Sequence, residues 1–285
     1  MISSGQLKRI AGELNVNPDF AERDYLLGWF LNALSRHEFF VDLFAVKGGS
    51  GLRKFYFTDH RFSHDLDFTA RKNLDAATIT NEVKAALVPV FRFLEEQGGF
   101  QIAREQTRIE IKNLTENGFQ LELRIYLNGP LRQRLPNLMI RFDANCRHGL
   151  VCDPESRSII HLYPDAETFD HPMSVYCLEE ILAEKFLCLA TRHRARDLYD
   201  IWAVLFHRQA RIDADKTRQA ISAKFAAVEK TTPQLSKLFS STLHSVYQQR
   251  WLGELKDTVI IELPNFQMAW DAVSHWYVNI VEAKR

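Results

Sequence analysis

The segment from Arg61 to Thr69 alternates between polar and apolar side chains, which predicts an extended strand. Asp65 and Asp67 fall on one face of this strand, while Leu66 and Phe68 fall on the other. Because aspartate is depleted in β-strands, two on one face favour a functional role over a merely solvated edge strand. The segment therefore predicts a sheet with an apolar face that packs on the core and an opposite face that presents functional carboxylates.

A cluster of small residues precedes this strand. Lys47, Gly48, Gly49, Ser50 and Gly51 follow an apolar stretch over 39–46. Glycine N–H groups can approach phosphate oxygens closely, so the cluster is a candidate phosphate cradle, although a tight turn between a strand and a helix explains it equally well. Neither the Walker spacing nor the dinucleotide-binding GxGxxG spacing occurs.

Asp143 supplies a third carboxylate. Between Leu138 and Asp143 apolar and polar side chains alternate again, so Asp143 points away from the face of Leu138, Ile140 and Phe142. Mg²⁺ prefers hard oxygen ligands, and a third carboxylate on a neighbouring strand completes a two-metal site for phosphoryl transfer. Asp65, Asp67 and Asp143 are therefore candidate metal ligands.

The wider pattern divides the chain into two parts. Helices are expected over 20–36, after Asn17-Pro18, and over 75–97, and strands over 109–111, 119–127 and 138–143. From about residue 176 the pattern is helical. The expected fold is α+β, with a mixed sheet and flanking helices over 1–170 and a helical domain over 171–285.

Composition excludes several classes of protein. The 285 residues include 36 basic and 36 acidic ones, and this balance argues against a surface that is basic throughout. No apolar run is long enough to cross a membrane. Four cysteines without CxxC spacing, and an opening without a signal-peptide pattern, favour a reduced, cytoplasmic protein. Cys146, His148 and Cys152 could be drawn as a zinc site, but structural sites normally have tighter paired spacings.

A lysine is directed inward in the second part. In the expected helix over 178–190, Lys185 falls within the apolar stripe. It could extend its stem to solvent, form a structural salt bridge or hold an anionic ligand; we favour the ligand. Arg192, His193, Arg194 and Arg196 begin the next helix. Asp197 could pair with Lys185 or touch ligand, and Arg196 could pair with Asp200 at i, i+4.

Two further groups of residues have simpler interpretations. A basic stretch, alternating with apolar residues, is either a solvated strand face or an electrostatic path for RNA or nucleotide phosphates; it contains Arg124, Arg132, Arg134, Arg141 and Arg147. Trp251, Trp270 and Trp276 have core-like spacing and are interpreted as packing residues.

Four stretches together resemble a known family. They are FAVKGGSGLR over 44–53, RFSHDLDF over 61–68, LEEILAEK ending at Lys185, and RHRARDLYD over 192–200. Their order and spacing, with the strand ending at Asp143, are similar to those of the AbiEii/AbiGii-type nucleotidyltransferase toxins of the DNA polymerase β-like superfamily. The resemblance touches about a third of the chain and is more specific than any single motif.

The resemblance implies a nucleotidyltransferase-type sheet, a helical domain, and a nucleotide bound between them. It also implies two Mg²⁺ ions, an NTP substrate, an RNA acceptor such as the tRNA 3′ end, and a cognate antitoxin protein. The catalytic residues it implies are Asp65, Asp67, Asp143, Lys185 and Asp197. The nucleotide-binding residues it implies are Lys47, Gly48, Gly49, Ser50, Arg53, Ser63, Lys185 and Arg196.

The sequence departs from the family pattern at two positions. Gly51 replaces the usual alanine, and His64 replaces the usual glutamate but is expected to face away from the metal ligands. The gap from Ser50 to Asp65 is longer than in many nucleotidyltransferases. The family pattern therefore assigns no role to Asp59, His60 and Arg61, although Arg61 could meet a phosphate.

Competing functions remain open. The acceptor could be a protein. His64-Asp65 with His37 or His60 could form a histidine–aspartate phosphohydrolase site, but that needs a helix where alternation favours a strand. A non-catalytic binding module would lack a carboxylate, and none is missing.

Overall fold

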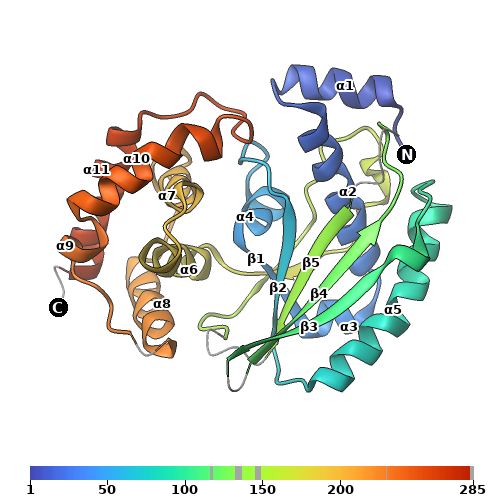
Figure 1. Cartoon of the computed structure of the whole chain (residues 1–285), viewed down its shortest axis with the longest axis horizontal. Coiled ribbons are helices and arrows are strands. Elements are labelled where there is room, and N and C mark those ends of the chain that lie inside the picture. The colour runs from blue at the N-terminus through green and yellow to red at the C-terminus, as the bar shows by residue number, and fades with distance from the viewer. Residues whose placement is uncertain (116–117, 132–136, 145–148, 229, 283–285) are drawn as a thin grey trace. The chain divides into compact units, whose positions relative to one another are not determined.

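The computed structural model describes residues 1–115, 118–131, 137–144, 149–228 and 230–282. Contacts divide the chain into two compact units. The first comprises Met1–Gly149 with Pro154–Val175, and the second comprises Leu150–Asp153 with Tyr176–Arg285 (Figure 1).

The described strands of the first unit form one seven-stranded sheet in the order β3-β4-β5-β2-β1-β7-β6. β2 runs parallel to β5 and β1 runs parallel to β7, whereas the other neighbouring pairs are antiparallel. The strands are β1 (Phe44–Lys47), β2 (Asp65–Ala70), β3 (Arg108–Thr115), β4 (Gly118–Tyr126), β5 (Asn137–Ala144), β6 (Glu155–Arg157) and β7 (Met173–Val175).

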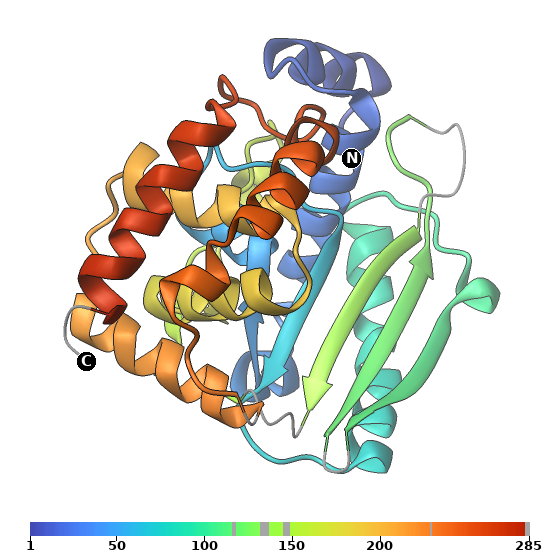
Figure 2. The ribbon, with the colours of Figure 1, turned by 60° about the vertical axis from the view of Figure 1, so that its left-hand side comes forward.

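Apolar side chains cover one face of this sheet. The Phe68 ring on β2 stacks on the Phe142 ring on β5, with centroids 4.9 Å apart, and both are fully buried. Helices α2 and α5 pack against each other and contact β5 and β4, with α5 behind the strands in Figure 2. The helices of this unit are α1 (Ser4–Glu13), α2 (Pro18–Leu34), α3 (Glu38–Leu43), the single turn α4 (Gly48–Gly51) and α5 (Ala76–Glu96).

The second unit is built from helices. Helix α6 contacts α7 and α8, and α7 also contacts α10 and α11. Trp251 and Trp270 are buried and Trp276 stacks on Phe186, which confirms the packing interpretation of the tryptophans. The helices are α6 (Leu178–Thr191), α7 (Ala195–Trp202), α8 (Ala214–Ala227), α9 (Leu235–Leu238), α10 (Ser241–Leu255) and α11 (Phe266–Tyr277).

The α+β prediction is confirmed, and α2 begins as expected, with the Asn17 side chain accepting from the Asp19 N–H and Pro18 in the first turn. The strand predicted from Arg61 begins only at Asp65. The residues before Asp65 form a loop instead. Arg53 fixes the first part of this loop by donating to the carbonyls of Thr58 and His60. None of the described helices combines the length and apolar character that crossing a membrane requires.

Some predictions fall on residues outside the described ranges. These residues are Arg132, Arg134, Cys146, Arg147 and His148. Of the zinc candidates only Cys152 is described, and it is a buried free thiol.

Candidate active site

The polar face of the sheet carries a row of charged side chains. Because cross-strand neighbours share a face, the register aligns Lys47 on β1 with Asp67 on β2, Arg141 on β5 and Glu122 on β4. Asp65 lies two residues before Asp67 on this face, and Asp143 pairs in register with Thr69, two residues beyond it. The three aspartates therefore share one face, as their alternation predicted.

Two cations connect these carboxylates. The Arg141 Nη1 atom lies 2.9 Å from an Asp65 oxygen and 3.4 Å from an Asp67 oxygen. The Lys47 ammonium lies 2.5 Å from an Asp143 oxygen. The first unit thus brings two groups of ion pairs onto one face of the sheet, Arg141 with Asp65 and Asp67, and Lys47 with Asp143.

The pKa of Asp67 is set mainly by its removal from water. Partial burial raises the pKa of Asp67 above its ordinary value, Lys47 and Arg141 oppose this rise, and the Asp143 and Asp65 carboxylates add a smaller increase. Burial opposes the charge on Arg141, but Asp67 and Asp65 outweigh it and hold the pKa of Arg141 above its ordinary value.

The glycine cluster forms the turn that follows β1. Gly48 has a φ of 70°, a conformation that favours glycine, and a Cβ there would lie 3.8 Å from an Asp67 oxygen. A Cβ on Gly49 would lie only 2.8 Å from the buried Arg61 guanidinium. The Ser50 hydroxyl donates to the Asp65 carbonyl. This hydrogen bond ties the cluster to the start of the aspartate strand.

Two predicted nucleotide-binding residues lie apart from the carboxylates. Arg53 is buried, its Nε 3.2 Å from Asp24 and its guanidinium 4.1 Å from the Phe62 ring centroid. Ser63 is half-buried in the loop before β2. The structure brings neither side chain into the Arg141 and Lys47 ion pairs.

The second unit holds the other predicted residues in a separate buried network. The Lys185 ammonium on α6 lies 2.8 Å from Asp197 and 2.7 Å from Asp200, both on α7. Arg192 donates two 2.8 Å hydrogen bonds to Asp197. Burial opposes ionisation, but Lys185 and Arg192 outweigh it and hold the pKa of Asp197 below its ordinary value.

The predicted pairing of Arg196 with Asp200 is wrong, because the buried Lys185 ammonium takes that carboxylate. Among the residues that the structure describes, Arg196 has no ion-pair partner. A desolvated ammonium gains more from a second carboxylate than a half-exposed guanidinium does.

Two neighbours of Asp143 and Arg141 were not predicted to belong to the site. Gln120 on β4 donates to Asp143 at 2.6 Å, and Glu122 accepts from Arg141 at 3.4 Å. Their alternation along β4 was visible, but their partners depend on the β4–β5 register.

The histidines of the alternative phosphohydrolase site have other surroundings. Asp65 begins a strand rather than lying on a helix. His37 packs against Phe40, the buried His60 against Phe57, and His64 against Phe20. Nothing in this geometry supports a histidine–aspartate metal site.

The carboxylates suit a divalent cation chemically. No three side chains of histidine, cysteine, aspartate or glutamate converge as ligands within the described ranges. Even so, Asp65 and Asp67 both contact the same positively charged atom, Nη1 of Arg141. Hard carboxylate oxygens on one face are the donors that Mg²⁺ prefers.

Two solved structures resemble this fold over nearly the whole chain. MenT4, a nucleotidyltransferase toxin from Mycobacterium tuberculosis H37Rv, is 19% identical with a TM-score of 0.57, covering 96% of this chain and 99% of that chain. JHP933 from Helicobacter pylori is 15% identical with a TM-score of 0.53, and the match covers 94% of each chain. No curated protein matches the sequence.

The family comparison covers most of the chain. Residues 29–272 match the family described as nucleotidyl transferase AbiEii toxin, type IV TA system. This range includes the carboxylate ion pairs of the first unit and the Lys185 network of the second. The chain therefore belongs to the AbiEii family of nucleotidyltransferase toxins of type IV toxin–antitoxin systems.

Proposed function

We propose that this enzyme transfers a nucleoside monophosphate from an NTP to RNA, with the tRNA 3′ end as acceptor, in a Mg²⁺-dependent reaction in the cytoplasm. The observation that carries the proposal is the shared face of Asp65, Asp67 and Asp143 on adjacent parallel strands. Two Mg²⁺ ions held there would supply Lewis-acid stabilisation of the charge that develops on the phosphate oxygens.

The chain's own residues have distinct roles in this proposal. Asp65 and Asp67 hold the metal ions, while Asp143 helps to hold them and orients the acceptor hydroxyl. Lys47, Gly48, Gly49 and Ser50 line the turn that borders Asp67 and bind the triphosphate through N–H groups and the ammonium. The buried Arg53 fixes the loop before β2 and so affects nucleotide binding without contacting the nucleotide. Ser63, in the same loop, binds the nucleotide directly.

In the second unit we propose that Lys185 and Arg196 meet phosphate and that Asp197 positions Lys185. The support is that Lys185 is an ammonium buried with two carboxylates, which hold it in one place. We assign nucleotidyl transfer to residues 1–170 and this helical contribution to residues 171–285.

Exposed cations near the carboxylates favour RNA over a protein acceptor. Arg124 on β4 pairs in register with Met139 on β5, as Asp65 does on β2, so Arg124 and Asp65 share the polar face. Lys112 on β3 lies across from Gln120 on this face. Both cations lie near the Glu122 carboxylate and remain partly exposed, and cations in this position beside the three aspartates are suited to a phosphate backbone.

The test incubates the purified protein with Mg²⁺, each α-labelled NTP in turn and total cellular RNA. We expect label in a tRNA-sized band with wild type, and a loss of at least about a hundredfold with Asp65→Asn or Asp67→Asn. Asp42→Asn, which removes an exposed carboxylate from α3, is the matched control and should retain the wild-type rate. Label in protein but not in RNA would replace the RNA acceptor with a protein, and no label in either would refute the proposed reaction.

A second experiment separates the two possible roles of Lys185. If Lys185 binds phosphate, Lys185→Ala raises KM for NTP, measured at a temperature at which the variant is folded. If the role is structural only, Lys185→Ala lowers the melting temperature and leaves KM unchanged.

A further inference from the structure

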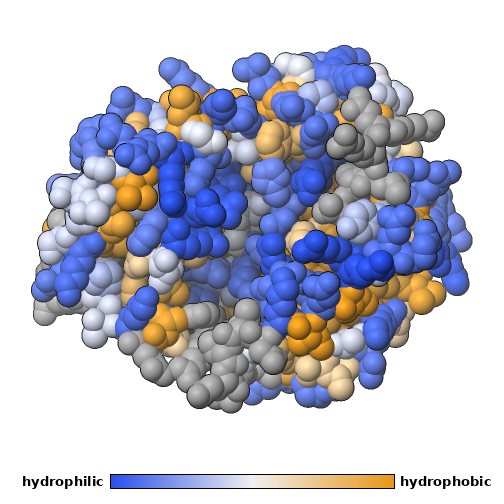
Figure 3. Space-filling view, in the orientation of Figure 1, coloured by the Kyte–Doolittle hydropathy of each residue, from blue (hydrophilic) through white to orange (hydrophobic). Residues whose placement is uncertain are grey.

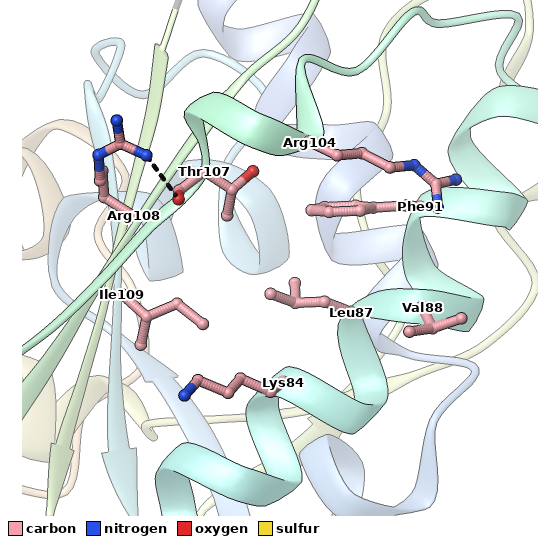
Figure 4. Close-up of a pocket in the computed structure, with 8 residues that line it drawn as sticks. All are labelled: Lys84, Leu87, Val88, Phe91, Arg104, Thr107, Arg108 and Ile109. Carbon is pink, nitrogen blue, oxygen red and sulfur yellow. Dashed lines mark hydrogen bonds between the residues drawn. The ribbon is translucent and has the colours of Figure 1, made fainter.

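The strand β3 forms one edge of the sheet and lies beside a groove. In the described part of the chain β3 pairs only with β4, so every second residue along its other side offers an unpaired N–H and C=O. A groove of about 510 Å³ separates the start of β3 from α5, as Figure 4 shows. Unpaired strand edges of this kind are templates for another extended segment.

The floor of the groove is apolar. Leu87 on α5 points toward Ile109 on β3, the Phe91 ring lies above them, and Val88 lines the outer side of the groove (Figure 4). Val88 is 53% exposed, and Ile111, which continues the Ile109 face of β3, is 43% exposed. In Figure 3 apolar side chains gather over the region of β3 and α5. Exposed aliphatic side chains beside a strand edge indicate a protein contact.

The rim of the groove is basic. Lys84, Arg104 and Arg108 line it, and no acidic residue does. Arg104 is paired with Glu95 and lies over the Phe91 ring. Arg108 donates only to the carbonyls of Glu105 and Thr107, and within the described ranges neither Lys84 nor Arg108 has a carboxylate partner. The groove therefore has spare positive charge next to its apolar floor.

We propose that the β3 edge and this groove bind a protein partner through an extended segment in which acidic and small aliphatic residues alternate. The segment would add to β3 as a strand. Its aliphatic side chains would enter the groove beside Ile109 and Leu87, and its carboxylates, on the opposite face of the added strand, would meet Arg108. The part of this edge before the register shift at Asn113–Thr115, from Arg108 to Lys112, accommodates about five residues of partner, roughly 17 Å.

A second copy of this chain is a poorer occupant. An antiparallel pairing of two β3 strands that matches Ile109 with Ile111 would place Glu110 opposite Glu110 and Arg108 opposite Lys112. Like charges directly opposite each other destabilise a strand pair. RNA would use the cations but gains little from the aliphatic floor, and Arg104 already lies over the Phe91 ring.

The test measures binding of a fluorescent eight-residue peptide in which glutamate alternates with valine. We expect saturable binding to the full chain, weakened at least about tenfold by Ile111→Asp and by Arg108→Glu. Leu252→Asp, at a 62% exposed position on α10, should bind as wild type. A peptide with lysine in place of glutamate should not bind. Backbone amide exchange over 109–112 should slow when the glutamate peptide binds.

Nucleotidyl transfer is measured on each variant separately, so that failure of this proposal is distinct from failure of the proposed reaction. Melting temperatures confirm that the variants fold, which is expected because both substituted side chains are exposed. Either variant alone is enough to test the proposal if the other does not fold. Absence of peptide binding, binding unaffected by both substitutions, or unchanged amide exchange over 109–112 would overturn the proposal. Tighter binding of a twelve-nucleotide single-stranded RNA that Arg108→Glu abolishes would assign the groove to RNA instead.

Discussion

The Arg141 guanidinium lies 2.9 Å from the Asp65 carboxylate, on the strand next to it. The same nitrogen is 3.4 Å from Asp67, while the Arg141 Nε atom is 3.4 Å from Glu122 on the opposite side. Arg141 is thus shared between the proposed metal ligands and a carboxylate outside them. A divalent cation and this guanidinium would compete for the same oxygens.

Arg141→Gln is therefore expected to tighten the binding of a divalent cation to the nucleotide-free protein. The ion pairs with Asp65 and Asp67 are partly exposed and together contribute about 1 kcal/mol, so we expect about a fivefold gain in affinity. Titration with Mn²⁺, followed calorimetrically, measures it. Arg124→Gln removes a partly exposed guanidinium from the same face, one that contacts Glu122 but, among the ion pairs of the described residues, neither Asp65 nor Asp67, and is the control. Equal or weaker Mn²⁺ affinity in Arg141→Gln would show that the arginine does not compete.

The sequence predicts local relationships well and distant partners poorly. The common face of Asp65 and Asp67 follows from the two-residue period of a strand, and the burial of Lys185 follows from the helical period. Lys47 and Asp143, by contrast, lie 96 positions apart. Their contact depends on how β1, β2 and β5 align, which no local pattern specifies. The Arg196–Asp200 prediction failed for the same reason, because a residue on another helix competed for Asp200.

The need for glycine at position 28 also depends on a residue far away in the sequence. A Cβ at this position on α2 would lie 2.6 Å from Nδ1 of His161, whose ring stacks 3.8 Å from Phe169. Gly28→Ala should therefore destabilise the protein by about 1 to 3 kcal/mol through overpacking. Urea unfolding measures the effect. Gly12→Ala on α1 meets nothing within 4 Å and should be neutral or stabilising. Equal effects of the two substitutions would contradict the steric explanation.

Asp197 should make the second unit sensitive to acid. Its pKa in the folded protein lies below the unfolded value of about 3.9, because Lys185 and Arg192 outweigh the opposing effect of burial. The stability this provides is present above the unfolded pKa and is lost as pH falls through the folded one. Asp197→Asn should be less stable than wild type at pH 7 and should lose less stability between pH 5 and pH 3. Urea unfolding at each pH checks this, and parallel pH profiles for the two proteins would refute it.

The buried pair of Glu180 and Lys224 leads to a prediction about two substitutions made together. Both side chains are fully buried, and Glu180 also accepts from the N–H groups of Val151 and Cys152. Lys224→Met leaves an uncompensated buried carboxylate and should cost about 3 to 5 kcal/mol.

Adding Glu180→Gln to Lys224→Met should restore part of that stability. The amide carries no charge to desolvate, yet its oxygen can still accept from the backbone of residues 151–152. The free energies of unfolding of the two single variants and the double variant form a complete cycle with wild type. If the double variant is less stable than Lys224→Met, the cost of the single substitution comes from lost packing and not from the isolated charge. Recovery of about 1 kcal/mol or more would instead show that electrostatic balance, and not the shape of the lysine, holds residues 150–153 against the helices of the second unit.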